Sequence, residues 1–188
     1  MIEYRIHGRG GQGSVAAAYL LATTAFQAGQ MCQAFPAFGA ERRGAPVTAF
    51  VRTGTEPIRL RSQVRAPHFL IVQDGTLLQD KKIATGLRPG GAMVVNTTRD
   101  SKQVADNFGC RALAIPATEM AVEALGRPIP NTALLAALLR ATGLFAAEAL
   151  HEALADRFSG AVLEGNLRLV RQVTEMVGPD IWKATADA

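Results

Sequence analysis

A short strand near the start of the chain runs directly into a glycine-rich turn, and this turn opens a helix. Residues 3–7 alternate polar and apolar side chains. Residues 14–27 are rich in alanine and leucine without a helix breaker, which predicts a helix that ends near Gly29. Glycines let the backbone turn tightly and let an anion approach main-chain N–H groups at the positive end of a helix. The motif therefore predicts an α/β fold with an anion site formed by Gly8, Gly10, Gly11, Gln12 and Gly13.

The spacing Gly8-x-Gly10-x-x-Gly13 is that of the dinucleotide-binding fingerprint, which also requires an acid at the end of the second strand to bind a ribose hydroxyl. Residues 30–35, which include the second predicted strand, contain no acid, so an NAD site is not supported. An NADP site would use arginine instead, and it stays an alternative. A P-loop is excluded because no Gly-Lys-Ser/Thr follows the turn. The last alternative is that the glycines only allow close packing of helix on strand.

A second loop of unusual composition spans residues 35–46, Phe-Pro-Ala-Phe-Gly-Ala-Glu-Arg-Arg-Gly-Ala-Pro. Its consecutive Arg42 and Arg43 are suited to bidentate binding of carboxylate or phosphate. Ion pairing with Glu41 is the alternative role, but a surface ion pair contributes only about 0–1 kcal/mol to stability. We therefore predict that Arg42 and Arg43 anchor phosphate groups of a ligand or dock a partner subunit.

The chain has 188 residues and a net charge of +4, and the positive charge is concentrated in its first third. Residues 1–65 hold eight arginines and three acids, whereas the remainder holds 12 basic and 13 acidic residues. This distribution indicates an anionic ligand or an acidic partner surface. Nucleic acid is disfavoured because the sequence has no lysine runs and no basic stretch interleaved with aromatics. Since no secretion signal and no apolar run of about 18 residues is present, we expect a cytoplasmic protein without a membrane span.

The cysteines and histidines match no metal-site spacing. Cys32 and Cys110 are 78 positions apart, and the three histidines are scattered, with no cysteine or carboxylate at ligand spacing: His7, His68 and His151. We predict structural roles for all five, with each cysteine buried at the end of a strand, and no metal bound by this chain. No acid/base constellation is present in the sequence, so no catalytic residue is predicted.

Strand and helix patterns alternate along the chain, which predicts a single three-layer α/β/α domain over residues 1–188. Further strands are expected at 31–35, 47–53, 57–60, 68–73, 92–96 and 111–115. A hairpin is expected across Gly54, between segments 47–53 and 57–60. Its antiparallel pairing would make the otherwise mostly parallel sheet mixed. Helices are expected at 118–125, 132–142, 147–158 and 161–177, with Thr118 and Asn131 as N-caps of the first two.

The order of these motifs resembles the gamma subunit of pyruvate or 2-oxoacid:ferredoxin oxidoreductase. The resemblance covers nearly the whole chain. It rests on residues 8–13, the loop Pro36–Gly44, the strand at Val51-Arg52, Pro130-Asn131-Thr132, Gly143, Phe158 and Glu164-Gly165-Asn166. For Asn131 and Asn166 we predict structural roles, as capping or interface residues.

The resemblance implies a complex that oxidatively decarboxylates a 2-oxoacid and transfers the acyl group to coenzyme A. It implies that thiamine diphosphate, Mg²⁺ and [4Fe-4S] clusters lie mainly on the alpha, beta and delta-type subunits, and that electrons pass to ferredoxin or another acceptor. For this chain it implies coenzyme A binding and subunit docking. The residues expected to do so are Gly8, Gly10, Gly11, Gln12, Gly13, Arg42 and Arg43.

Two alternatives of a different class remain: a stand-alone NADP-binding reductase and a pure assembly module that binds no small molecule. The missing ribose acid and the absence of an acid/base constellation disfavour the reductase. The form Glu41-Arg42-Arg43-Gly44-Ala45-Pro46 resembles the pyruvate branch of the family more than the indolepyruvate branch. The 2-oxoacid (pyruvate, an aryl-glyoxylate or another) and the acceptor (ferredoxin, or NAD through a flavin subunit) stay open at the level of the sequence.

Overall fold

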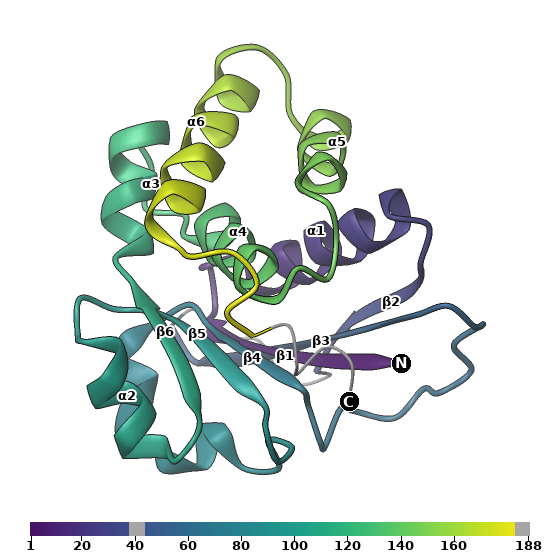
Figure 1. Cartoon of the computed structure of the whole chain (residues 1–188), viewed down its shortest axis with the longest axis vertical. Helices are drawn as coiled ribbons and strands as arrows, with labels where there is room; N and C mark the ends of the chain where they lie inside the picture. Colours follow the sequence, from purple (N-terminus) through teal and green to yellow (C-terminus); the bar gives the residue numbers. More distant parts are fainter. Residues whose placement is uncertain (38–43, 183–188) are drawn as a thin grey trace.

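A computed structural model describes residues 1–37 and 44–182, and this part of the chain forms a six-stranded sheet in the order β2-β3-β1-β4-β5-β6. The strands are β1 (Ile2–Arg9), β2 (Met31–Pro36), β3 (Pro46–Gly54), β4 (Phe69–Val72), β5 (Ala92–Asn96) and β6 (Arg111–Ile115). β1, β4, β5 and β6 pair in parallel, and β3 is antiparallel to both β1 and β2. The prediction of an α/β fold with a mixed, mostly parallel sheet is confirmed (Figure 1).

Helices cover the two faces of the sheet unequally (Figure 1). The larger core is shared by the sheet with α1 (Ser14–Gln27), α3 (Ala117–Leu125), α4 (Asn131–Thr142), α5 (Ala147–Arg157) and α6 (Gly160–Met176). The smaller core, on the other face, is shared with α2 (Ser101–Phe108) and two 3₁₀ helices, η1 (Gly75–Gln79) and η2 (Lys81–Ala84). α4 is buried almost all round, which is why its sequence is apolar on every side. In the described residues, no helix combines the length and apolarity that crossing a bilayer requires.

The predicted hairpin between residues 47–53 and 57–60 is wrong. β3 pairs with β1 on one side and with β2 on the other, so segment 57–60 has no free edge of β3 to pair with. The carbonyl groups of Leu60 and Ser62 instead accept hydrogen bonds from the Arg52 guanidinium. The antiparallel strand that makes the sheet mixed is therefore correctly placed at β3, but its expected partner is not.

Three further details differ from the sequence prediction. α2 was missed because it is short and mostly polar: Val104 is its one buried residue, and Asp100 caps it by accepting two backbone N–H groups. Thr118 lies inside α3 rather than at its N-cap. Asn131 is the first residue of α4, and its side chain crosses to the carbonyl oxygen of Gly13 instead of capping its own helix.

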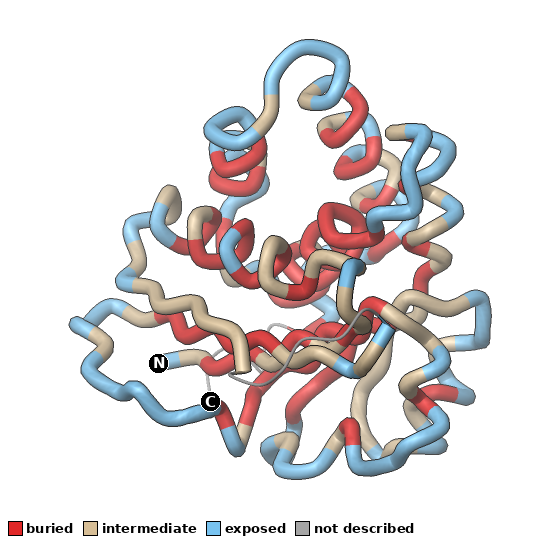
Figure 2. Tube along the Cα trace, turned by 180° about the vertical axis from the view of Figure 1, so that it is seen from behind, coloured by how far each residue is buried: buried red, intermediate tan, exposed pale blue. Residues whose placement is uncertain are grey.

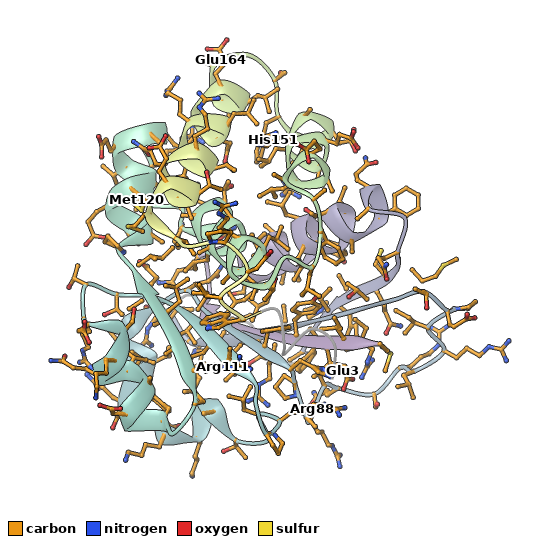
Figure 3. All side chains as sticks on the ribbon, viewed as in Figure 1. Glu3, Arg88, Arg111, Met120, His151 and Glu164 are labelled. Atoms are coloured by element: carbon orange, nitrogen blue, oxygen red, sulfur yellow. The ribbon has the colours of Figure 1, made fainter. Side chains whose placement is uncertain are left out.

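A buried ion pair joins the start of β1 to the end of β3. The side chain of Arg52 is 1% exposed, and its Nε donates to Glu3 Oε1 at 2.9 Å. Its terminal nitrogens donate to Gln33 Oε1 at 3.2 Å and to the Ser62 carbonyl oxygen at 2.7 Å. Arg88 approaches the second oxygen of Glu3 at 3.5 Å from the solvent side (Figure 3). The buried guanidinium is thus compensated by a carboxylate and holds the chain that follows β3.

His7, in β1, is kept neutral by its surroundings. Its Nε2 accepts a hydrogen bond from Arg5 Nε at 2.9 Å, which places the proton of the neutral ring on Nδ1. Burial, and secondly the charge of Arg5, lowers the pKa of His7 to about 3. Because histidine in an unfolded chain has a pKa of about 6.5, the unfolded state binds a proton before the folded state does. Stability is therefore lost as the pH falls from about 6.5 towards 3.

We expect the free energy of unfolding to decrease between about pH 6.5 and pH 5, and to decrease less in a His7→Gln variant. The pKa of His68 is also lowered, mainly by burial, so the variant keeps part of the slope. Urea unfolding at several pH values within this interval measures the effect. An equal slope in the variant and the unaltered chain would contradict a neutral, buried His7.

Candidate functional site

The glycine turn lies where the chain leaves two adjacent parallel strands toward opposite faces of the sheet. β1 leads through the turn into α1, which contributes to the larger core, whereas β4 leads into η1, which contributes to the smaller core. In open α/β sheets the crevice at such a switch point, outside the carboxyl ends of the strands, is the usual place for a ligand. The turn therefore lies at the carboxyl ends of β1 and β4, where ligand binding is expected.

The turn is held by backbone hydrogen bonds to the end of the loop between β2 and β3. The Gly10 N–H donates to the Ala45 carbonyl oxygen at 2.8 Å, and the Gly44 N–H donates to the Gly10 carbonyl oxygen at 3.2 Å. Gly11 and Gly13 have φ angles of 93° and 80°, a region that glycine adopts readily. Arg42 and Arg43 lie outside the described residues. Gly44 and Ala45, which follow them directly, are hydrogen-bonded to Gly10 of the turn.

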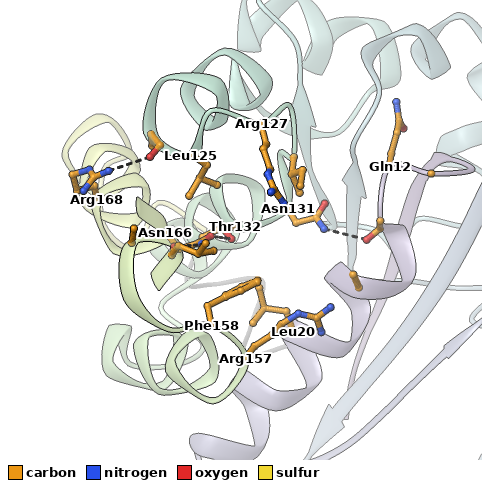
Figure 4. Close-up of a pocket in the computed structure, with 17 residues that line it drawn as sticks. Gln12, Leu20, Leu125, Arg127, Asn131, Thr132, Arg157, Phe158, Asn166 and Arg168 are labelled. Atoms are coloured by element: carbon orange, nitrogen blue, oxygen red, sulfur yellow. Dashed lines mark hydrogen bonds between the residues drawn. The ribbon is translucent and has the colours of Figure 1, made fainter. Parts of the chain in front are cut away.

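The Gln12 side chain points away from the centre of the site (Figure 4). Its Oε1 accepts the Arg9 backbone N–H at 2.7 Å, and its Nε2 donates to Asp74 Oδ2 at 2.9 Å. Arg9 Nε donates to the same carboxylate oxygen at 3.0 Å. Burial alone would raise the pKa of Asp74, but hydrogen bonds from Thr76 and Gln12 and the charge of Arg9 lower it. Gln12 and Asp74 thus stabilise the turn through these side-chain hydrogen bonds and the ion pair with Arg9.

A buried series of hydrogen bonds connects the turn to β4 and α4. Ser14 Oγ donates to Gln73 Oε1 at 2.9 Å, and Gln73 Nε2 donates to Asn131 Oδ1 at 2.5 Å. Asn131 Nδ2 then donates to the Gly13 carbonyl oxygen at 3.1 Å. Gly8 packs directly on this series, because a Cβ at Gly8 would overlap Ser14 Oγ. Gly8 therefore serves the close packing that was an alternative explanation of the motif.

A cavity of about 560 Å³ lies beside the turn, between the helices (Figure 4). It is lined by Gly11, Gln12, Gly13, Ala16, Leu20, Ala124, Leu125, Arg127, Ile129, Asn131, Thr132, Arg157, Phe158, Ala161, Val162, Asn166 and Arg168. Three helices, α1, α4 and α6, begin at this cavity, and in the described structure none of their N-termini has a side-chain cap. The first N–H groups of a helix carry partial positive charge, so the three helix starts favour an anion here.

Three arginines line the cavity, and among its described lining residues there is no carboxylate. Arg127 lies in the α3–α4 loop, Arg157 is the last residue of α5, and Arg168 lies on α6. Arg168 donates to the Ala124 carbonyl oxygen at 3.2 Å, and the Arg157 guanidinium carbon lies 5.8 Å from the centre of the Phe158 ring. The rest of the wall is largely apolar. The cavity is therefore suited to a ligand that is anionic in one part and apolar in another.

Only some of the site residues predicted from the sequence line the cavity. Gly11, Gln12 and Gly13 line the cavity, Gln12 with its side chain turned away, whereas Gly8 and Gly10 lie on the sheet side of the turn. The arginines of the cavity were not among the residues predicted from the sequence: Arg127, Arg157 and Arg168. Each is a single arginine in a different segment, the α3–α4 loop, the end of α5 and the middle of α6, so no local pattern marked them. The nearest signals were residues noted in the family resemblance that also line the cavity: Asn131, Thr132, Phe158 and Asn166.

No group of three or more His, Cys, Asp or Glu side chains comes together in residues 1–37 and 44–182. Cys32 lies in β2 and Cys110 directly precedes β6, so they stand at opposite edges of the sheet. Both are half-buried, not buried as predicted, and burial raises the pKa of both thiols. The described cysteines therefore do not offer a ligand set for an iron–sulfur cluster.

Comparison with known proteins gives matches over almost the whole chain. Residues 3–176 match the family described as pyruvate ferredoxin/flavodoxin oxidoreductase. The common gamma subunit of the pyruvate/ketoisovalerate oxidoreductases of Thermococcus kodakarensis is 47% identical over 176 residues, which cover 92% of this chain and 95% of that one. Subunit PORC of pyruvate oxidoreductase from Thermotoga maritima has a TM-score of 0.81 and 38% identity, with coverage of 93% and 95%.

A third match is to part of a longer protein. The 2-oxoglutarate:ferredoxin oxidoreductase from Magnetococcus marinus was solved with 2-oxoglutarate, coenzyme A and succinyl-CoA bound. The match has a TM-score of 0.74 and 22% identity, and covers 95% of this chain but 32% of that one. At this identity the match shows a shared fold.

Proposed function

The chain belongs to the pyruvate ferredoxin/flavodoxin oxidoreductase family as a gamma subunit, and from this premise we propose that it supplies a coenzyme A site and docking surfaces to its complex. The complex oxidatively decarboxylates a 2-oxoacid, for which pyruvate is the first choice because it is named for both relatives above, and forms an acyl-CoA. Thiamine diphosphate, Mg²⁺ and [4Fe-4S] clusters belong to the alpha, beta and delta-type subunits in this proposal.

The cavity beside the glycine turn carries the proposal for coenzyme A. Coenzyme A has a diphosphate and a 3′-phosphate on an adenosine, joined to an uncharged pantetheine arm. Guanidinium groups such as those of Arg127 and Arg157, and the N–H groups at the start of α1, suit the phosphates. The apolar walls suit the adenine or the arm. The bound coenzyme A in the Magnetococcus marinus enzyme, which contains the same fold, adds support.

This chain contributes positioning and electrostatics in the proposed role. Thiamine diphosphate supplies the decarboxylation chemistry when it is bound in the complex. The described residues that line the cavity include no Asp, Glu, His, Cys or Lys, so they offer no side chain that exchanges protons near neutral pH. Such a lining is suited to holding a charged co-substrate, and the acid/base steps are assigned to the other subunits.

Replacing Arg127 and Arg157 together with glutamate is expected to raise the KM for coenzyme A of the reconstituted complex at least tenfold. Each substitution removes a charge-assisted hydrogen-bond donor and places a like charge beside the phosphates. The KM for the 2-oxoacid should stay unchanged. The matched control is Arg99→Glu with Arg171→Glu, which makes the same change of charge at residues outside the cavity lining.

Direct titration of the isolated chain separates the alternatives. Binding of coenzyme A that is lost in the Arg127→Glu/Arg157→Glu variant supports the proposal. Binding of NADPH with no binding of coenzyme A would support the stand-alone reductase. Binding of neither ligand, together with an unchanged KM for coenzyme A in the variant complex, would support the pure assembly module.

We propose that Arg42 and Arg43 extend the same anion site or contact the subunit that holds thiamine diphosphate. Support comes from Gly44, which directly follows them and is hydrogen-bonded to Gly10 of the turn. An Arg42→Ala/Arg43→Ala variant is expected to need more coenzyme A or to assemble more weakly. Its iron content per complex should equal that of the unaltered complex. Loss of iron–sulfur clusters from an otherwise intact complex would contradict this division of roles.

A further inference from the structure

The connection between β3 and β4, residues 55–68, is irregular and basic. Its first part, residues 55–63, is an almost continuously exposed segment at the edge of the molecule (Figure 2). The three arginines of the connection, Arg59, Arg61 and Arg65, are all exposed, and its one acid is Glu56. Leu60, between the first two arginines, is 48% exposed. None of the three arginines has an ion-pair partner in the part of the chain that the structure describes.

This connection is anchored although it has no regular structure. The buried Arg52 guanidinium donates to the carbonyl oxygens of Leu60 at 3.4 Å and of Ser62 at 2.7 Å. Val64 is buried, and Arg88 donates from Nε to the Ala66 carbonyl oxygen at 2.8 Å. The backbone on both sides of Arg61 is therefore tied to the body of the protein, while the arginine side chains remain in solvent.

Fixing three arginines within seven residues increases their mutual repulsion, and no carboxylate of the described chain offsets it by pairing with them. Irregular connections longer than about 12 residues in a compact domain usually have a function. Arginines around an exposed leucine also match the composition of protein interfaces, in which arginine is enriched. An opposing acidic surface would convert the repulsion into attraction and would speed association.

We propose that residues 59–65 dock this chain onto an acidic surface of another subunit of its oxidoreductase complex. The inference rests on the gamma-subunit role. The connection lies at the end of the sheet where β3 ends and β4 begins, opposite to the glycine turn. Docking through it therefore leaves the cavity and the turn accessible to coenzyme A.

The test is co-purification of the complete complex through an affinity tag on this chain, with the Arg59→Glu/Arg61→Glu variant beside the unaltered chain. We expect the variant to recover at least tenfold less of the partner subunits at about 0.15 M salt. The thermal unfolding of the isolated variant should match that of the unaltered chain, because both side chains are exposed. The control is Arg99→Glu/Arg171→Glu, which should recover the partners normally.

Equal recovery by the variant and the unaltered chain would overturn the docking proposal and leave the gamma-subunit role intact. Equal losses in the variant and the control would overturn it as well, because a general effect of charge would then explain both. An unaltered chain that recovers no partner subunit would contradict the gamma-subunit role itself. Loss of self-association alone, with normal recovery of the partners, would show that a second copy occupies this surface and would overturn the proposal.

A second measurement identifies the chemistry of the partner. An Arg59→Lys/Arg61→Lys variant keeps the charge and introduces amines that a carbodiimide couples directly to carboxylates. We expect cross-links from positions 59 and 61 to Asp or Glu residues of one partner subunit in the assembled complex. Cross-links confined to this chain would overturn the assignment of an acidic partner.

Discussion

Replacing Arg52 with methionine is expected to lower the free energy of unfolding of this chain by about 3–5 kcal/mol. The substitution removes the guanidinium that neutralises the buried Glu3 carboxylate at 2.9 Å. It also leaves the Gln33 amide oxygen and the Ser62 carbonyl oxygen without this donor. Uncompensated buried charge is among the largest destabilising effects of a single substitution. Urea unfolding near pH 7.5 measures the loss.

Two comparisons show that the loss comes from the unpaired charge. A Glu3→Gln/Arg52→Met double variant should recover part of the stability, because it removes the buried carboxylate as well. Trypsin should cleave the single variant faster than the unaltered chain after the exposed Arg59 and Arg61, because Arg52 no longer holds the Leu60 and Ser62 carbonyl groups. A loss of stability below about 1 kcal/mol would show that Arg88, 3.5 Å from Glu3, compensates the charge on its own.

Replacing Gly8 with valine is expected to lower the free energy of unfolding by about 2–4 kcal/mol and to abolish the proposed binding of coenzyme A. A Cβ at this position would overlap Ser14 Oγ and would lie 2.8 Å from Gln73 Oε1. The Ser14–Gln73 hydrogen bond must then break, and the start of α1 must move away from β4. Chemical unfolding and titration with coenzyme A measure the two effects.

Gly11→Ala is the matched comparison for Gly8→Val. A Cβ at Gly11 would have no neighbour within 4 Å, so its effect comes from the φ angle of +93° alone. Backbone strain of this kind costs about 1–2 kcal/mol. We expect Gly11→Ala to be less destabilising than Gly8→Val and to weaken coenzyme A binding without abolishing it. A larger loss at Gly11 than at Gly8 would contradict the close packing of Gly8 against Ser14.

Much of the fold was predictable because its signals are local. Period-two alternation marked β1 and β3, compact apolar runs marked β4 and β5, and glycines marked the ends of α1 and α4. Two segments are exceptions. α2 is short and mostly polar, and residues 57–60 have the composition of a strand, but the Leu60 carbonyl group accepts a hydrogen bond from Arg52 instead of a strand partner.

The sequence by itself determined the glycine-rich strand–turn–helix motif, the alternation that gives an α/β fold, and, from motifs in the right order along the chain, the family. Each motif depends on residues that are close in the sequence, where backbone preferences and hydrophobic periodicity act. Only the tertiary structure decided that β2 pairs with β3 and that Gly8 packs on Ser14 and Gln73. It alone brought together Arg127, Arg157 and Arg168 with three helix starts, because burial of the apolar helix faces sets which distant side chains become neighbours.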